Sequence, residues 1–103
     1  MRSYEHPPLN SIELPQALHA LSDPCRLKIV STLLESNGQL MACNEFDLGV
    51  SKATASHHFD VLRNSGVTQT IVQGTKCMTS LRIEEFEDRF PGVLKLIANE
   101  VKD

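Results

Sequence analysis

Apolar residues recur along most of this chain at the three- and four-residue spacing of helices, and the texture changes after residue 66. Helical stretches are predicted at residues 13–21, 24–35, 39–48 and 51–66, and from about 84 onward. Between them, residues 67–73 and 77–83 are rich in valine, threonine and isoleucine and flank a Gly-Thr turn. The pattern therefore predicts a mainly α chain with a small β-hairpin.

Capping residues set the expected boundaries of these helices. Asp23, followed by a proline, is a typical helix start, and Ser51 can accept a hydrogen bond from a first-turn amide. Gly66 can end the second of these helices because glycine takes positive φ at little cost. A Pro-Gly pair at 91–92 is expected to kink or restart the last helix.

The helix over residues 51–66 has two unlike faces. Ala55, Phe59 and Leu62 form an apolar stripe, flanked by His58 and Val61. The opposite face carries Lys52, Ala53, Ser56, His57, Asp60, Arg63 and Asn64. Its first half is small or hydrogen-bonding, so it suits the base edges of a major groove, although an ordinary solvated helix face has the same pattern.

Length and composition indicate one globular domain over residues 13–103, preceded by a flexible N-terminal arm over residues 1–12. No apolar run approaches the roughly 20 residues of a membrane helix, and no signal peptide is visible. The cysteines are Cys25, Cys43 and Cys77, odd in number and far apart, which disfavours a disulfide scaffold. We therefore expect a cytoplasmic protein with no membrane partner.

Charge is distributed unevenly along the chain. The net charge of −3 does not favour nucleic acid. However, residues 51–82 hold four basic side chains and one acidic one, whereas residues 83–103 hold three basic and six acidic ones. This placement fits a basic reading surface and a separate acidic region.

A helix, a Gly-containing turn and a helix over residues 40–66, then a hairpin and a closing helix, predict a winged helix-turn-helix. The chain resembles ArsR-type transcriptional regulators from about residue 13 to residue 100. The resemblance rests on Leu21–Leu27 with its Ser-Asp-Pro-Cys-Arg core, on Ser51–Gly66 with Ser-His-His-Phe and Val-Leu-Arg, and on the hairpin with its glycine. The run Arg89–Leu94 resembles a subgroup without the usual metal-binding motifs.

The resemblance implies a homodimer that binds double-stranded operator DNA and usually represses it. The residues themselves lead us to expect no cofactor. Family base-reading positions fall at the start of the 51–66 helix, and a position that suits a DNA-backbone contact falls near its end. The hairpin tip would approach the flanking phosphates or the minor groove. The implied DNA-binding residues are Lys52, Ala53, Thr54, Ser56, His57, Arg63, Gln73, Thr75 and Lys76.

Apolar stripes at both ends of the chain suit a dimer interface, because the helix-turn-helix itself does not need them. The residues are Leu14, Leu18, Leu21, Phe90, Val93, Leu94, Ile97 and Val101. The alternative is that the later stripe packs on its own domain.

The signal that would release such a regulator is not evident from the residues. The last helix has no histidine and no two cysteines are closely spaced, so no metal site is expected. Cys25 stands at a helix N-terminus, where the dipole can lower a thiol pKa, and is the candidate thiol sensor; a buried structural cysteine is the alternative. Cys77 is expected to be simple packing, and His58 to be packed and hydrogen-bonded. Any inducer is expected to be a thiol reagent or a small organic ligand.

Three classes of function can be compared on this sequence. A DNA-binding regulator fits the motifs best. A winged-helix module that makes protein contacts is the alternative, supported by the net acidity. An enzyme is disfavoured, because neither a Ser/His/Asp set nor a nucleotide loop is apparent.

Overall fold

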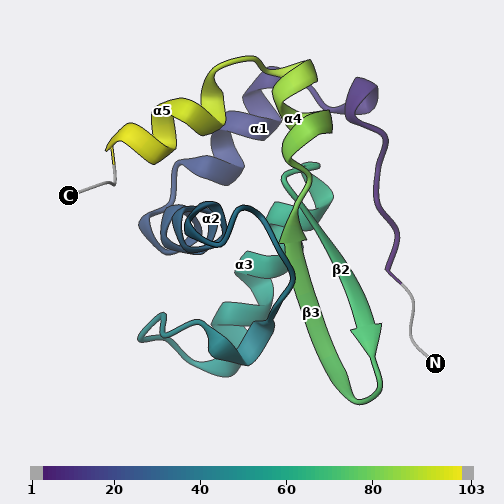
Figure 1. Ribbon diagram of the computed structural model, residues 1–103, viewed down its shortest axis with the longest axis vertical. Coiled ribbons are helices and arrows are strands. Elements are labelled where there is room, and N and C mark those ends of the chain that lie inside the picture. Colours follow the sequence, from purple (N-terminus) through teal and green to yellow (C-terminus); the bar gives the residue numbers. More distant parts are fainter. Residues whose placement is uncertain (1–3, 101–103) are drawn as a thin grey trace.

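The structure, a computed structural model, describes residues 4–100 and has the predicted winged helix-turn-helix architecture (Figure 1). Its helices are α1 (Leu14–Leu21), α2 (Pro24–Glu35), α3 (Lys52–Asn64), α4 (Ile83–Arg89) and α5 (Val93–Glu100). Its strands are β1 (Met41–Ala42), β2 (Thr68–Gln73) and β3 (Lys76–Leu81), in the antiparallel order β1-β3-β2. The β2–β3 hairpin is the wing, and Figure 1 shows it projecting away from the helical body.

The predicted helix boundaries are confirmed by their caps. The Asp23 carboxylate accepts hydrogen bonds from two first-turn amides of α2, at 2.8 and 3.1 Å. The Ser51 hydroxyl accepts the Thr54 amide of α3 at 3.1 Å. Gly66 has a φ of 79°, and a Cβ there would lie 2.9 Å from a methyl carbon of Leu9. Glycine is therefore favoured at this position by the positive φ, and a larger residue would also have to move the Leu9 side chain.

The helix predicted over residues 39–48 is wrong. Met41 and Ala42 form β1 instead, and Cys43–Glu45 form a single 3-10 turn, η2. β1 pairs with β3, so the sheet has three strands rather than the two of the wing alone. A helix of fewer than about 12 residues is marginal by itself, whereas the open edge of β3 offers ready hydrogen-bond partners.

The core lies between α2, α3 and the C-terminal helices. Ile29 and Leu33 of α2, Leu62 of α3 and Phe86 of α4 are completely buried. The chain breaks between α4 and α5 at the predicted Pro-Gly pair, and α5 then packs back on α2. None of the helices between residues 4 and 100 is long and apolar enough to cross a membrane.

Residues 4–12, predicted to belong to a flexible arm, instead pack along the body; residues 1–3 lie outside the described part. Leu9 begins a 3-10 turn, η1 (Leu9–Ser11), and is only 8% exposed, while Ile12 is 2% exposed. These two apolar side chains join the main core, which the polar and proline-rich composition of the segment concealed.

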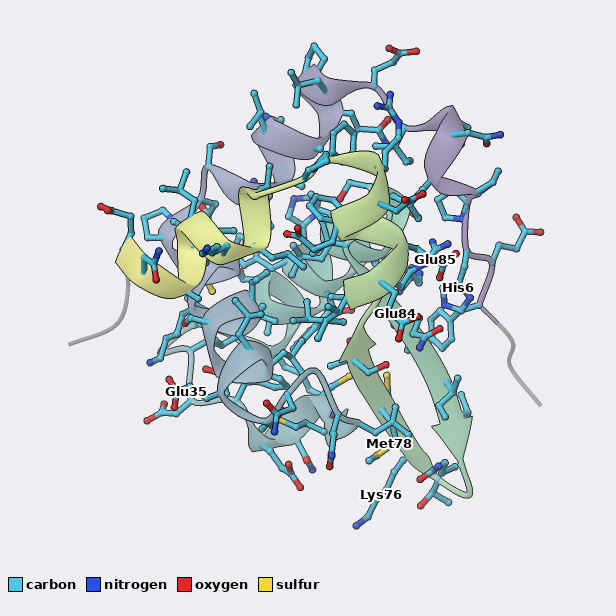
Figure 2. The ribbon with its side chains drawn as sticks, turned by 45° about the horizontal axis from the view of Figure 1, so that its top comes forward. His6, Glu35, Lys76, Met78, Glu84 and Glu85 are labelled. Atoms are coloured by element: carbon cyan, nitrogen blue, oxygen red, sulfur yellow. The ribbon has the colours of Figure 1, made fainter. Side chains whose placement is uncertain are left out.

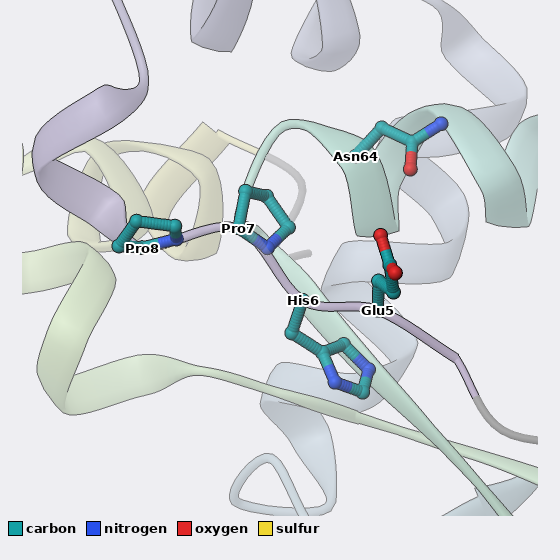
Figure 3. A pocket seen from close by; sticks show the side chains of 5 residues that line it. All are labelled: Glu5, His6, Pro7, Pro8 and Asn64. Atoms are coloured by element: carbon teal, nitrogen blue, oxygen red, sulfur yellow. The ribbon is translucent and has the colours of Figure 1, made fainter.

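His6 attaches this N-terminal segment to the wing. Its Nε2 accepts the backbone N–H of Thr70 on β2 at 2.9 Å. Figure 3 shows the His6 ring beside the hairpin, in a hollow that Asn64 also lines. Burial, with the charges of Arg82 and Arg63, lowers the pKa of His6 below its usual 6.5. The ring is therefore suited to remain neutral and to keep accepting the strand amide.

Candidate nucleic-acid interface

The start of α3 presents small and hydrogen-bonding side chains to solvent. The exposed side chains are Lys52, Ala53, Thr54, Ser56 and His57. The hydroxyl of the N-cap, Ser51, also donates to the Thr54 hydroxyl at 2.9 Å, so the first turn is fixed at both its backbone and a side chain. This surface is the one that periodicity predicts to face away from the core.

The opposite side of α3 is anchored in the protein. His58 and Phe59 are each 8% exposed, and Leu62 is fully buried. The ring of Phe46, from the loop before α3, meets the Phe59 ring edge-on at 5.4 Å. This loop therefore supports α3 although it is not helical.

Arg26, to which the sequence analysis gives no role, connects α3 to the first two helices. It is 7% exposed, and its guanidinium donates to the carbonyls of Ala20 at 2.7 Å and His19 at 3.3 Å. Its Nη1 also lies 3.0 Å from His58 Nδ1. Because a guanidinium only donates, Nδ1 accepts, which leaves the ring proton on Nε2. The prediction of a packed, hydrogen-bonded His58 is confirmed.

Asp23 accepts hydrogen bonds from the backbone amides of Cys25 and Arg26 at the start of α2. The hydrogen bond from the Arg26 amide lowers the pKa of the Asp23 carboxyl, and the guanidinium charge adds to that effect. An arginine three residues after an Asp-Pro helix start is the sequence signal from which Arg26 could have been found. Through these hydrogen bonds, the start of α2 is joined to both α1 and α3.

The wing tip is the second exposed polar element. Gln73, Gly74, Thr75 and Lys76 are all exposed, and the glycine turns the chain with a φ of 64°. Figure 2 shows the Lys76 side chain at the tip, far from Glu84 and Glu85 at the start of α4. The positive charge of the wing is thus kept apart from the acidic C-terminal region.

A cleft of about 730 Å³ separates α3 from the wing. Lys52 and Ser56 line it from the helix, and Thr75 and Lys76 line it from the hairpin. The structure therefore brings together, across one concave surface, predicted DNA-binding residues from two distant parts of the sequence.

Arg63, predicted to contact the DNA backbone, lies deep in this cleft. It forms an ion pair of 2.8 Å with Asp60, and its guanidinium lies 4.5 Å from the centre of the Tyr4 ring. Only 12% of its side chain is exposed. These contacts give Arg63 a part in joining the N-terminal segment to α3.

Comparison with known proteins shows the family of this chain. The profile of bacterial regulatory proteins of the arsR family matches residues 23–69, from the cap of α2 into β2. An HTH-type transcriptional regulator of Bacillus subtilis, YceK, is 38% identical over 84 residues, which cover 80% of this chain and 83% of that protein. The chain belongs to the arsR family.

Two further relatives extend this similarity. An HTH-type transcriptional regulator of Methanocaldococcus jannaschii is 32% identical over 79 residues, or 76% of this chain and 83% of that protein. A cadmium resistance transcriptional regulatory protein, CadC homolog, of Staphylococcus aureus is 34% identical over 73 residues, or 70% of this chain and 60% of that protein. The arsR family consists of transcriptional regulators that bind DNA and is not a class of enzymes.

One relative, the CadC homolog, is named for cadmium resistance, which raises the question whether residues of this chain fit a metal ion. Among residues 4–100, Asp23, Cys25 and His58 bring one ligand atom each within 4.8 Å of one another. However, Arg26 occupies His58 Nδ1 and adds a positive charge at the same place. Because a bound cation would have to displace this buried arginine, the group does not fit a metal ion.

The cysteines differ from expectation. The dipole at the start of α2 was expected to lower the pKa of Cys25, but burial and the Asp23 carboxylate raise it. Cys43 and Cys77, which the sequence leaves apart, lie with their sulfur atoms 3.0 Å from each other. Sequence reasoning missed this pair because neither strand pairing nor η2 was expected at Cys43.

The predicted dimer residues fall into two groups. Leu21, Phe90, Leu94 and Ile97 are at most 8% exposed and belong to the core of the single chain, so they are not available to a partner. Leu14 and Leu18 are 48% and 51% exposed on α1, and Val93 is half-buried; Val101 lies outside the described residues. Leu96 of α5, not predicted, is 59% exposed. The apolar surface is therefore smaller than expected and centred on α1 and the outer side of α5.

Proposed function

We propose that this arsR-family chain is a homodimeric, sequence-specific DNA-binding protein that represses transcription at a two-fold operator until a signal releases it. The observation that carries the proposal is the exposed, acid-free start of α3 facing the cationic wing tip across one cleft. A recognition helix and a wing on one concave surface suit a duplex, whose groove accepts the helix while its backbone meets the hairpin.

The two elements have different roles in this proposal. Ser56 and His57 carry short hydrogen-bonding groups, and with Lys52, Ala53 and Thr54 they read base edges in the major groove. Lys76, with Gln73 and Thr75 beside it, contacts flanking phosphates, which adds affinity without sequence preference. Arg63 supports the cleft from within, because its charge is already paired with Asp60.

Dimerisation follows from the size of the reading surface. One recognition helix reads few base pairs, whereas two copies on a two-fold axis read half-sites about 34–36 Å apart on one side of the DNA. Figure 1 shows α1 and α5 at the end of the molecule away from the wing tip. The exposed Leu14, Leu18 and Leu96 on these helices support an isologous contact there, with the wings outermost.

Base reading is tested by substitution at α3. The operator is selected from a random DNA pool, and binding is followed by fluorescence anisotropy on that site and on random duplex. His57→Ala should weaken binding to the selected site by about 1–3 kcal/mol and leave binding to random DNA unchanged. His19→Ala, an exposed histidine on α1, is the matched control. Wild-type affinity of His57→Ala on both DNAs would contradict the assignment.

Phosphate contact is tested at the wing. Lys76→Ala should weaken binding to both DNAs alike. It should also reduce the salt dependence of that binding by about one released counterion. Lys95→Ala removes an exposed lysine from α5 and should change neither property. A protein-contact module, the alternative function, would show no salt-dependent duplex binding in any of these variants.

Assembly is tested by sedimentation. Leu18→Glu should give a folded monomer that loses operator binding, whereas Leu40→Glu, at a 39% exposed leucine before β1, should remain dimeric. A wild-type chain that sediments as a monomer at micromolar concentration, yet binds one half-site specifically, would refute the dimer.

A further inference from the structure

Two thiols meet at the edge of the wing. Cys43 begins η2 and Cys77 lies near the start of β3, and their sulfur atoms are 3.0 Å apart. The pairing of β1 with β3 explains the approach: Ala42, the last residue of β1, stands opposite Met78, and Cys43 and Cys77 are the next residues outward along the two segments. Figure 2 labels Lys76 and Met78, the neighbours of Cys77 on β3.

This cross-strand position suits a disulfide. Residues directly opposite each other in an antiparallel pair have Cα atoms about 4.5–5.5 Å apart, within the range of about 4.4–6.8 Å that disulfides span. A bond between the sulfurs needs an approach of only about 1 Å, because the S–S bond is about 2.05 Å long. The bridge can therefore form without unpairing the strands.

Both thiols also line the cleft between α3 and the wing, together with Lys52 and Lys76 and with the Arg63–Asp60 ion pair. A group attached to either sulfur would extend into the space where these cationic side chains lie. An anionic group would be held there by their charge. The third cysteine, Cys25, is on the first turn of α2 and does not line this cleft.

We propose that Cys43 and Cys77 are a site of reversible oxidation by low-molecular-weight disulfides, and that the product is an intrachain Cys43–Cys77 bridge. The Cys77 thiolate attacks one sulfur of the reagent, whose S–S bond breaks and releases the first thiolate. The Cys43 sulfur then attacks the Cys77 sulfur of the mixed disulfide, gives up its proton to the departing group and releases the second thiol. The two thiols lose two electrons, and the reagent gains them.

The order of attack follows from the surroundings of the two sulfurs. Burial, with the hydrogen bond to Cys77, raises the pKa of the Cys43 thiol to about 12 in the reduced pair, which disfavours Cys43 as the first nucleophile. An adduct on Cys77 removes that hydrogen bond, so Cys43 can attack in the second step. Cys77 therefore reacts first, and Cys43 acts as the resolving thiol that expels the adduct. This expulsion keeps the cleft clear while the bridge leaves α3 and the wing in place.

The chemistry is tested in a Cys25→Ser background with dithiobis(nitrobenzoate), an anionic disulfide that releases a coloured thiolate. The parent should release two thionitrobenzoate ions per chain and retain no adduct, with Cys43 and Cys77 bridged by peptide mapping and freed by dithiothreitol. Cys43→Ser should release one ion and keep the adduct on Cys77. A retained adduct on the parent, a bridge between chains, or a bridge that forms only in urea would overturn the proposal. The parent retains both Cys43 and Cys77. Its peptide map therefore answers the question even if a substitution at Cys43 or Cys77 prevents folding.

The consequence for DNA rests on the proposed function and is measured separately. The Cys43→Ser adduct should bind duplex about tenfold or more weakly, whereas the bridged parent should stay within about threefold of its reduced form. An adduct that forms as described but leaves duplex binding unchanged would refute the placement of DNA at this cleft. In that case the dithiol chemistry would stand and the proposed interface would fail.

Discussion

Replacing the buried Arg26 with methionine should destabilise the protein severely, because one guanidinium joins three helices. It donates to the Ala20 carbonyl of α1 at 2.7 Å and to His58 Nδ1 of α3 at 3.0 Å, both in buried surroundings. Its third bond, to the His19 carbonyl at 3.3 Å, is only partly buried, so water can replace it.

The magnitude follows from the two buried bonds. A hydrogen bond from a charged donor contributes about 1.5–3 kcal/mol, and a buried acceptor left without a partner pays its full desolvation cost. Methionine fills much of the volume of the stem and relieves the burial of a charge, which offsets part of the loss. We therefore expect Arg26→Met to lower the free energy of unfolding by about 3–5 kcal/mol, out of a typical total of about 5–15 kcal/mol.

Urea unfolding followed by circular dichroism measures this loss, with an unchanged m-value as the sign that the folded state is retained. Lys95→Met removes an exposed cation from α5 and should change stability by no more than about 0.5 kcal/mol. A double-mutant cycle of Arg26→Met with His58→Gln should show a coupling of about 1 kcal/mol or more. A loss below about 1 kcal/mol for Arg26→Met, or an additive cycle, would refute the reasoning.

Three further variants test the packing and the pH dependence of stability by the same unfolding assay. Leu94→Glu together with Ile97→Glu should unfold the chain rather than split a dimer, because the two side chains are 3% and 8% exposed within one protomer; a folded monomer by circular dichroism and sedimentation would contradict this. Gly66→Ala should lower the free energy of unfolding by about 1–2 kcal/mol, because φ is positive and the new methyl meets Leu9. An unchanged free energy of unfolding would contradict a positive φ at residue 66. The free energy of unfolding should fall as the pH drops below 6.5, because the lowered pKa of His6 makes the folded chain bind fewer protons than the unfolded chain. His6→Ala should reduce that slope as the pH falls through 6.5, and an unchanged slope would exclude His6 as a cause.

The sequence by itself determined the features that depend on neighbouring residues. Asp23 and Ser51 each mark a helix start because a short polar side chain satisfies amides two or three residues away. The spacing of Phe59 and Leu62 is enough to show which side of α3 is exposed, because helical geometry fixes the angle between them. The fold and the predicted base-reading surface of α3 therefore follow from local rules, and the family resemblance agrees with both.

Only the tertiary structure decided what depends on distant partners. Periodicity shows that Leu94 and Ile97 share a buried face, but whether that face meets its own core or a second chain depends on how α5 returns to α2. The segment around Met41 became a strand because β3 had an open edge, and that pairing alone brought two cysteines together across the sheet. A local pattern records which face of an element is apolar; it does not record what covers that face, because the covering residues lie elsewhere in the chain.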